Sequence, residues 1–129
     1  MKGLDTSILI RYLTQDDPIQ SLRANAIVDN LSADAPGFVS LVTIAEIAWA
    51  LRSRYKATAQ EIATAVERIL ASDHLAVQNE QQVYEAMLAL KANTGTFADA
   101  LIGALGTWAG CSSTFTFDRS SRLPNFEVA

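Results

Sequence analysis

The sequence of 129 residues has a single cysteine, Cys111, and a single histidine, His74. One cysteine cannot form a disulfide within the chain, a pattern that favours a reducing compartment over secretion. These two residues also give no constellation of nitrogen and sulfur ligands that would suggest a zinc site. The sequence therefore excludes a disulfide-stapled fold, and any metal site is expected to use oxygen ligands.

The sequence also lacks long apolar runs, and none approaches the roughly 20 residues of a membrane-spanning helix. The first expected strand starts at Lys2, directly after Met1, so we expect no signal peptide. Together these features predict a soluble, cytoplasmic protein with no membrane partner. Basic residues are in the minority, 10 against 14 acidic ones, and the net charge of −4 argues against a general nucleic-acid binder with a basic surface.

The length and composition of the chain are those of one ordinary globular domain. Half of the chain is hydrophobic, and no repeat, linker or low-complexity tract interrupts it, so we expect a single domain over residues 1–129. Short apolar runs alternate with longer helical patterns, which predicts an α/β fold with a parallel sheet. Strands are expected at 2–6, 38–40, 75–77, 114–117 and 126–128, the last at an edge. Helices are expected at 8–13, from Pro18 with Asp17 as its cap, at 43–55, from the capping box Thr58–Glu61, from a second box Asn79–Gln82, and at 97–108.

Four of the fourteen carboxylates lie inside apolar runs, whereas the other ten lie in polar surroundings. An ionised carboxylate among apolar groups is unfavourable unless it is paired. No lysine or arginine lies within these runs, and the only adjacent base is Arg119. Such acids can pair with distant bases, bond to backbone N–H groups or share a cation. The four are Asp5, Glu46, Asp99 and Asp118.

The expected positions of these acids favour the cation. Asp5 and Asp118 end parallel strands, and Glu46 and Asp99 lie in the first turns of helices, so all four are expected at the carboxyl edge of the sheet, where ligands bind. Clustered carboxylates repel one another unless a positive charge compensates them. Oxygen ligands select Mg²⁺ or Mn²⁺, and such ions activate water for phosphodiester hydrolysis.

The residues around these acids resemble the four acidic motifs of the PIN-domain family, and in particular the VapC toxins of VapBC toxin–antitoxin pairs. The order and spacing match along the whole chain, and residues 11–18 are also similar to many VapC toxins. The matching segments are Leu4-Asp5-Thr6-Ser7-Ile8-Leu9, Val42-Thr43-Ile44-Ala45-Glu46-Ile47, Phe97-Ala98-Asp99-Ala100-Leu101-Ile102 and Thr114-Phe115-Thr116-Phe117-Asp118-Arg119.

This resemblance implies a doubly wound parallel sheet of order 3-2-1-4-5 with helices on both faces. It implies RNA cleavage that depends on Mg²⁺ or Mn²⁺, with the four acids as catalytic and metal-binding residues. It also implies a homodimer and a VapB-type antitoxin. Many relatives have aspartate at the position of Thr96 and asparagine at that of Ser7; we expect these hydroxyls, with that of Thr6, to support the site without adding charge.

Other roles for the same residues remain open. Asp5 and Asp118 can cap the elements that follow them, Asp99 can interact with the dipole of its helix, and Glu46 can pair with an arginine such as Arg52 or Arg119. Basic side chains are further candidates, because local basic patches around an acidic metal site would reconcile RNA binding with the acidic net charge. These candidates are Arg52, Arg54, Lys56 and Arg119.

Three functions stay open at this point. The first is an endoribonuclease toxin, the second an RNA-processing nuclease of the same fold without a toxic role, and the third a non-catalytic PIN interaction module. A phospho-receiver domain is disfavoured, because Asp5 is alone at its strand and no lysine follows Lys91.

Overall fold

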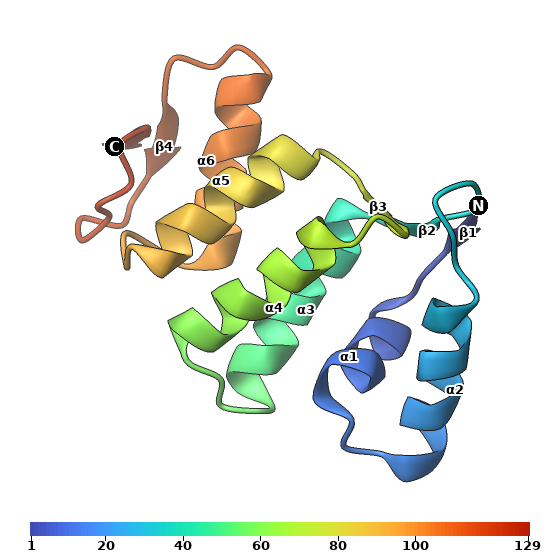
Figure 1. Ribbon diagram of the computed structural model, residues 1–129. Coiled ribbons are helices and arrows are strands. Elements are labelled where there is room, and N and C mark those ends of the chain that lie inside the picture. The colour runs from blue at the N-terminus through green and yellow to red at the C-terminus, as the bar shows by residue number, and fades with distance from the viewer.

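The computed structural model describes all of residues 1–129, which form six helices and five short strands (Figure 1). The strands are β1 (Lys2–Gly3), β2 (Gly37–Val39), β3 (Leu75–Val77), β4 (Thr114–Thr116) and β5 (Phe126–Val128). The helices are α1 (Thr6–Thr14), α2 (Pro18–Asp29), α3 (Leu41–Ser53), α4 (Ala59–Ala71), α5 (Glu80–Lys91) and α6 (Phe97–Trp108). None of the helices is long and apolar enough to cross a membrane.

Side-chain caps explain where several helices begin. The carboxylate of Asp17 accepts hydrogen bonds from the backbone of Ile19 and Gln20, with Pro18 at the first helical position, as predicted. The capping box of Thr58 and Glu61 is also confirmed, because each side chain accepts a bond from the backbone of the other. These bonds satisfy N–H groups that a helix leaves free at its first turn.

The second predicted capping box, at the start of α5, is wrong. Asn79 has a left-handed backbone with φ of 50°, and its side chain caps no N–H group. Instead its Nδ2 donates to Oε1 of Gln82 at 3.4 Å. An N-cap residue needs extended backbone to turn its oxygen toward the helix, whereas asparagine tolerates the left-handed conformation that the turn after β3 requires.

The strands form two separate parallel sheets. In the first, β2 lies between β1 and β3, with Lys2 opposite Gly37 and Gly37 opposite Leu75. In the second, β4 pairs with β5, with Thr114 opposite Phe126. The α/β class and the neighbours 3-2-1 and 4-5 are therefore as predicted. The expected pairing of β1 with β4 is absent, and no continuous five-stranded sheet forms within the chain.

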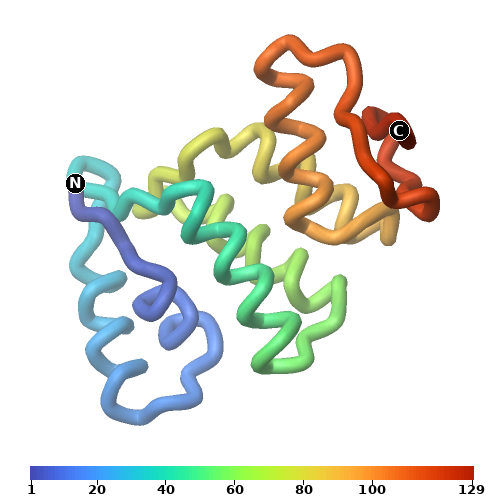
Figure 2. The backbone as a smooth tube through the Cα atoms, turned by 180° about the vertical axis from the view of Figure 1, so that it is seen from behind, coloured from blue at the N-terminus to red at the C-terminus, as the bar shows by residue number.

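The arrangement of the helices keeps β1 and β4 apart. The helices pack as three successive pairs, α1 with α2, α3 with α4 and α5 with α6, and α4 also packs on α5 (Figures 1 and 2). The strands β1 to β3 lie on one side of the molecule, and β4 lies on the other, beyond α5 and α6 (Figure 1). The core runs through the middle of this row, where Leu9, Val39, Ile44, Ile47 and Met87 are fully buried.

Candidate active site

The first two acids meet at the start of α1. The hydroxyl of Thr6 donates to Oε1 of Glu46 at 3.0 Å. The backbone N–H of the same threonine donates to Oδ1 of Asp5 at 2.8 Å, and the hydroxyl of Ser7 lies 3.3 Å from the other carboxylate oxygen of Asp5. Thr6 therefore links two exposed carboxylates that are 41 residues apart in sequence, from 5 to 46.

The local fold explains this meeting. Because β1 and β2 are parallel, their carboxyl ends lie at the same edge of the sheet, and the helices that leave them start side by side. Asp5 caps α1 and Ser40 caps α3, and the buried faces of the two helices belong to one core. Asp5 thus has the capping role that the sequence left open, and the residue is exposed.

No basic side chain compensates this pair of acids. The ion pairs of the structure are Arg11 with Asp16 and Lys91 with Glu67, so the alternative of an arginine partner for Glu46 is wrong. Two neighbouring carboxylates without a counter-charge favour a cation between or beside them. Their hard oxygen donors suit Mg²⁺ or Mn²⁺, which take few protein carboxylates and complete their shell with water.

The third acid lies in the first turn of α6. The N–H of Asp99 donates to the hydroxyl of Thr96 at 3.2 Å, so Thr96 is the N-cap of this helix. The carboxylate of Asp99 is half-buried and has no hydrogen-bond or salt-bridge partner on Asp5 or Glu46. Its position in the first turn also suits the helix dipole, a role that the sequence left open.

The fourth acid follows β4 and is held by its own turn. Oδ1 of Asp118 accepts from the backbone N–H of Ser120 at 2.9 Å and from its hydroxyl at 2.6 Å. These hydrogen bonds hold the pKa of Asp118 below its ordinary value, because they stabilise the ionised form. Asp118 therefore caps a turn, and the neighbouring Arg119 makes no ion pair with it.

The single chain does not bring the four acids together. No group of three or more carboxylate, histidine or cysteine side chains is close enough to hold one metal ion. Asp5 and Glu46 lie at the edge of the first sheet, whereas Asp118 follows β4, on the other side of the molecule (Figure 1). The expected convergence depended on β4 lying beside β1, and that pairing is the one the chain does not make.

A cleft of about 530 Å³ lies next to this site, between α3, the start of α4 and the start of α6. Its walls are mostly apolar, and two guanidinium groups, from Arg52 and Arg122, face it together with Thr96. Nη2 of Arg122 donates to the backbone oxygen of Asn93 at 2.9 Å, which fixes its position. The cleft is thus an apolar hollow with a basic rim.

The remaining basic candidates differ in their surroundings. Arg54 lies over the ring of Trp49 at 5.7 Å from its centroid, and this ring is exposed and also lines the cleft. The exposure of Trp49 has no signal in the sequence, because the residue lies within the apolar run of residues 47–51. Lys56 donates to the backbone oxygen of Ser53, and Arg119 is exposed in the turn after β4.

The model of the PIN domain matches residues 3–125, nearly the whole chain. The chain belongs to the PIN-domain family. No curated protein that was compared matches it significantly. PIN domains are generally metal-dependent nucleases, and the oxygen ligands of Asp5 and Glu46 fit the divalent metals that these nucleases use. Membership in the PIN-domain family therefore supports a nuclease function for this chain.

Proposed function

We propose that this PIN domain is a Mg²⁺- or Mn²⁺-dependent endoribonuclease that acts as the toxin of a type II toxin–antitoxin system in the cytoplasm. The observation that carries the proposal is the Asp5–Thr6–Glu46 arrangement, in which two exposed carboxylates meet without a basic partner. In a PIN domain, such a pair at the carboxyl edge of a parallel sheet suits a divalent metal. The likeness of residues 11–18 to many VapC toxins supports the toxic role.

In this proposal Asp5 and Glu46 are the main metal ligands, and Asp99 and Asp118 add negative charge from the other half of the fold. Thr6 orients both ligands, because its hydroxyl and its N–H hold one oxygen of each. Ser7 restrains the second oxygen of Asp5. When bound, the metal supplies an activated water and a positive charge for the scissile phosphate.

The basic rim of the cleft gives the RNA a place to bind. Arg52 and Arg122 offer bidentate donors to phosphate, and the exposed ring of Trp49 with Arg54 above it offers a surface for a base. Lys56 and Arg119 extend the positive charge on either side. An acidic protein binds RNA in this way through a local patch rather than through its net charge.

A VapB-type antitoxin and a second copy of the chain complete the proposed system. Two other functions of the same fold remain alternatives. An RNA-processing nuclease would use the same residues, and only its cellular role would differ. A non-catalytic interaction module is favoured by one observation, the separation of the acids in the single chain.

Cleavage of purified RNA tests the nuclease. The protein, freed of any antitoxin, is incubated with tRNA and rRNA in Mg²⁺, Mn²⁺ or EDTA. We expect discrete fragments only with metal, and a loss of more than roughly 100-fold in Asp5→Asn and Glu46→Gln, because even the outer partners of metal ligands contribute about 10- to 100-fold. Asp73→Asn is the matched control, since this exposed acid precedes β3 at the opposite edge of the sheet.

Two outcomes separate the alternatives. A wild-type protein that cuts no RNA and binds no Mn²⁺ would contradict the nuclease and favour the interaction module. The toxic role is tested in growing bacteria, where induced wild-type protein should arrest growth and Asp5→Asn should not. Cleavage in the test tube without growth arrest would favour a processing nuclease.

A further inference from the structure

One edge of the first sheet is open at β1. The N–H groups of Lys2 and Leu4 donate to Pro36 and Phe38 on the β2 side, at 3.3 and 2.9 Å. Neighbouring residues of a strand direct their backbone groups to opposite sides, so the N–H and the C=O of Gly3 point to the open edge. Gly3 is exposed, and no atom lies within 4 Å of the place where its Cβ would be.

The second sheet has a matching open edge at β4. The N–H of Thr114 donates to Asn125, and Thr116 accepts from the N–H of Ala129, both at 2.8 Å on the β5 side. The backbone groups of Phe115 therefore point to the other, open side. Phe115 on this strand is 72% exposed, and Phe117, which directly follows the strand, is 89% exposed, which is unusual for two neighbouring phenylalanines.

These two edges cannot meet within the chain in this arrangement. The row of helices α3 to α6 separates them, and Figures 1 and 2 show them on opposite sides from both directions. The unpaired backbone groups at the edge of a sheet invite another strand. Each chain thus presents one open edge of each kind.

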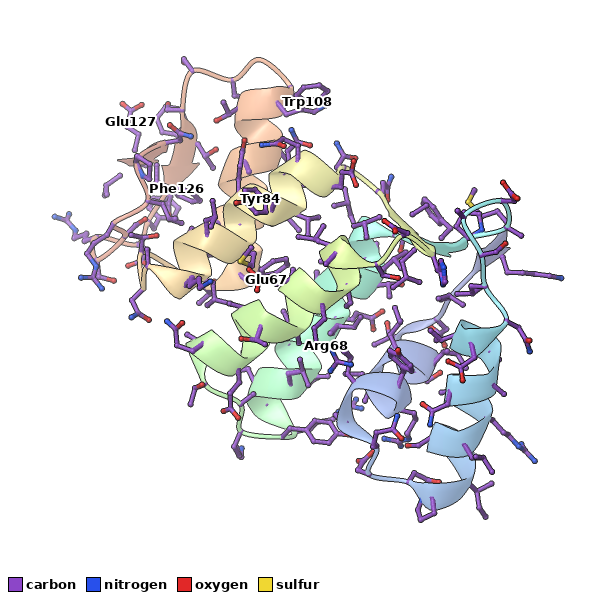
Figure 3. All side chains as sticks on the ribbon, viewed as in Figure 1. Glu67, Arg68, Tyr84, Trp108, Phe126 and Glu127 are labelled. Carbon is purple, nitrogen blue, oxygen red and sulfur yellow. The ribbon has the colours of Figure 1, made fainter.

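The helix before β4 supports the same conclusion. Nearly all residues of α6 are apolar or small, a composition typical of a helix that is covered on every side. Yet Ile102 is 54% exposed, and Trp108 lies exposed at the outer end of the helix (Figure 3). In α3, Val42 is exposed one turn before Glu46. Both halves of the molecule therefore leave apolar side chains uncovered near their open strand or its acids.

We propose that two copies of the chain exchange their C-terminal sheets, so that β4 of one copy pairs in parallel with β1 of its partner. The resulting sheet would read β3-β2-β1 from one copy and β4-β5 from the other. Asp5 follows Gly3 by two residues, and Asp118 follows Thr116 by two, so parallel pairing brings both acids to one edge. The inference rests on the proposed function, because it assembles that active site from two chains.

A second copy of the chain is the partner that fits both open edges, at β1 and at β4. Each copy donates β4 and accepts β4, so two exchanges close with two-fold symmetry and leave neither edge open. An unrelated strand on β1 would satisfy the backbone of Gly3 but would leave the edge of β4, with Phe115 and the following Phe117, uncovered. The exchange also gives Asp5 and Glu46 the acid from the turn after β4 that the single chain keeps apart from them.

Cross-linking tests the pairing without reference to activity. A Gly3→Cys chain and a differently tagged Phe115→Cys chain, both with Cys111→Ser, are refolded together from denaturant and oxidised. Neighbouring parallel strands are about 5 Å apart, within reach of a disulfide or a short bis-maleimide. We expect a covalent dimer that carries both tags, and a Phe126→Cys chain on the far strand β5 is the control that should not cross-link.

The double variant Gly3→Cys and Phe115→Cys decides between two chains and one. A cross-link between two copies supports the exchange. An internal cross-link that leaves the chain monomeric would overturn it, because the chain would then close on itself. Absence of any cross-link, with a monomer in sedimentation, would overturn it as well.

Complementation tests the shared active site. Asp5→Asn and Asp118→Asn chains are each expected to be inactive, but a mixed dimer with exchanged sheets contains one site with all four acids. After refolding together, RNA cleavage should recover to about a quarter of wild type, since half of the dimers are mixed and each has one intact site of two. A mixture of Asp5→Asn with Glu46→Gln should recover nothing, because both changes lie on the same half.

The two tests separate this inference from the proposed function. If the wild type cleaves RNA but the Asp5→Asn and Asp118→Asn mixture stays inactive, the shared site is overturned and the nuclease stands. If the wild type cleaves nothing, the nuclease fails, and the cross-link still reports whether the sheets exchange.

Discussion

The two halves of this PIN domain treat their acidic residues differently. In the half from β1 to α4, Asp5 and Glu46 are joined through Thr6 above a closed core. In the half from α5 to β5, Asp99 and Asp118 are held only by caps within their own segments, and large apolar side chains around them are exposed. Helix packing therefore positions the first pair, whereas the position of Asp118 depends on a strand pairing that one chain does not make.

The largest expected difference between the two halves is in the loss of stability when a large apolar side chain is shortened. Ile47 is fully buried between the first two helix pairs, so Ile47→Ala should lower the free energy of unfolding by about 2–5 kcal/mol. Phe115→Ser, on the exposed ring of β4, should change the stability of the monomer by less than about 0.5 kcal/mol. Urea unfolding at a dilution where the chain is monomeric measures both.

In sedimentation, which measures the association of two chains, the variant with the larger effect should be Phe115→Ser rather than Ile47→Ala. Phe115→Ser should weaken the proposed dimer, while Ile47→Ala should leave the association of the remaining folded protein nearly unchanged. A Phe115→Ser chain that destabilises the dilute monomer as much as Ile47→Ala would mean that this ring is covered within one chain, and the comparison between the halves would fail.

Thr6→Val tests how the first pair is held. The change keeps the shape and the backbone N–H that bonds to Asp5 but removes the hydroxyl that bonds to Glu46. We expect RNA cleavage to fall by roughly 10- to 100-fold, as for other residues that orient metal ligands, with unchanged circular dichroism. Thr6→Ser should restore most of the activity.

A matched control is available on another helix. Thr64→Val also removes a threonine hydroxyl, here one that bonds to the backbone of Gln60 on the exposed face of α4. It should leave cleavage at the wild-type level. If Thr6→Val retains full activity and full Mn²⁺ affinity, the link between the two acids has no part in metal binding.

Much of this architecture follows from local signals in the sequence. The helix of residues 97–108, the strand of residues 75–77 and the capping box at Thr58 need only neighbouring residues, and all were predicted within their observed bounds. The meeting of Asp5 and Glu46 was predictable too, because parallel strands gather their carboxyl ends at one edge.

The remaining features depend on contacts between segments that are far apart in the sequence. Pairing of β1 with β4 depends on how a unit of two helices packs against another, and apolar periodicity does not specify which faces meet. Asn79 and Gln82 match a capping box in type and spacing, yet the turn after β3 imposes a left-handed backbone that removes the cap. The exposure of Trp49 beside Arg54 likewise depends on the neighbouring cleft rather than on its own helix.

The smallest expected effect concerns the pH dependence of stability in the first half. Asp16 accepts hydrogen bonds from the hydroxyls of Thr14 and Tyr55, both at 2.7 Å, and pairs with Arg11. These contacts hold the pKa of Asp16 below its ordinary value of 3.8. Because the folded pKa is the lower one, the stabilisation is complete above the ordinary value and is lost as the pH falls through the folded value.

Asp16→Asn should therefore lower the melting temperature slightly at neutral pH, and the difference should shrink at acid pH as the wild-type carboxylate becomes protonated. The effect should be small because the group is exposed and its interactions are screened by solvent. Asp34→Asn, an exposed acid in the turn before β2, is the control and should give the same melting temperature as wild type at both pH values. A difference between Asp16→Asn and wild type that persists undiminished at low pH would show that these hydrogen bonds act through the shape of the side chain rather than through its charge. The charge of Asp16 would then contribute nothing to the packing of α1 against α2, and the two halves would differ only in how their side chains pack.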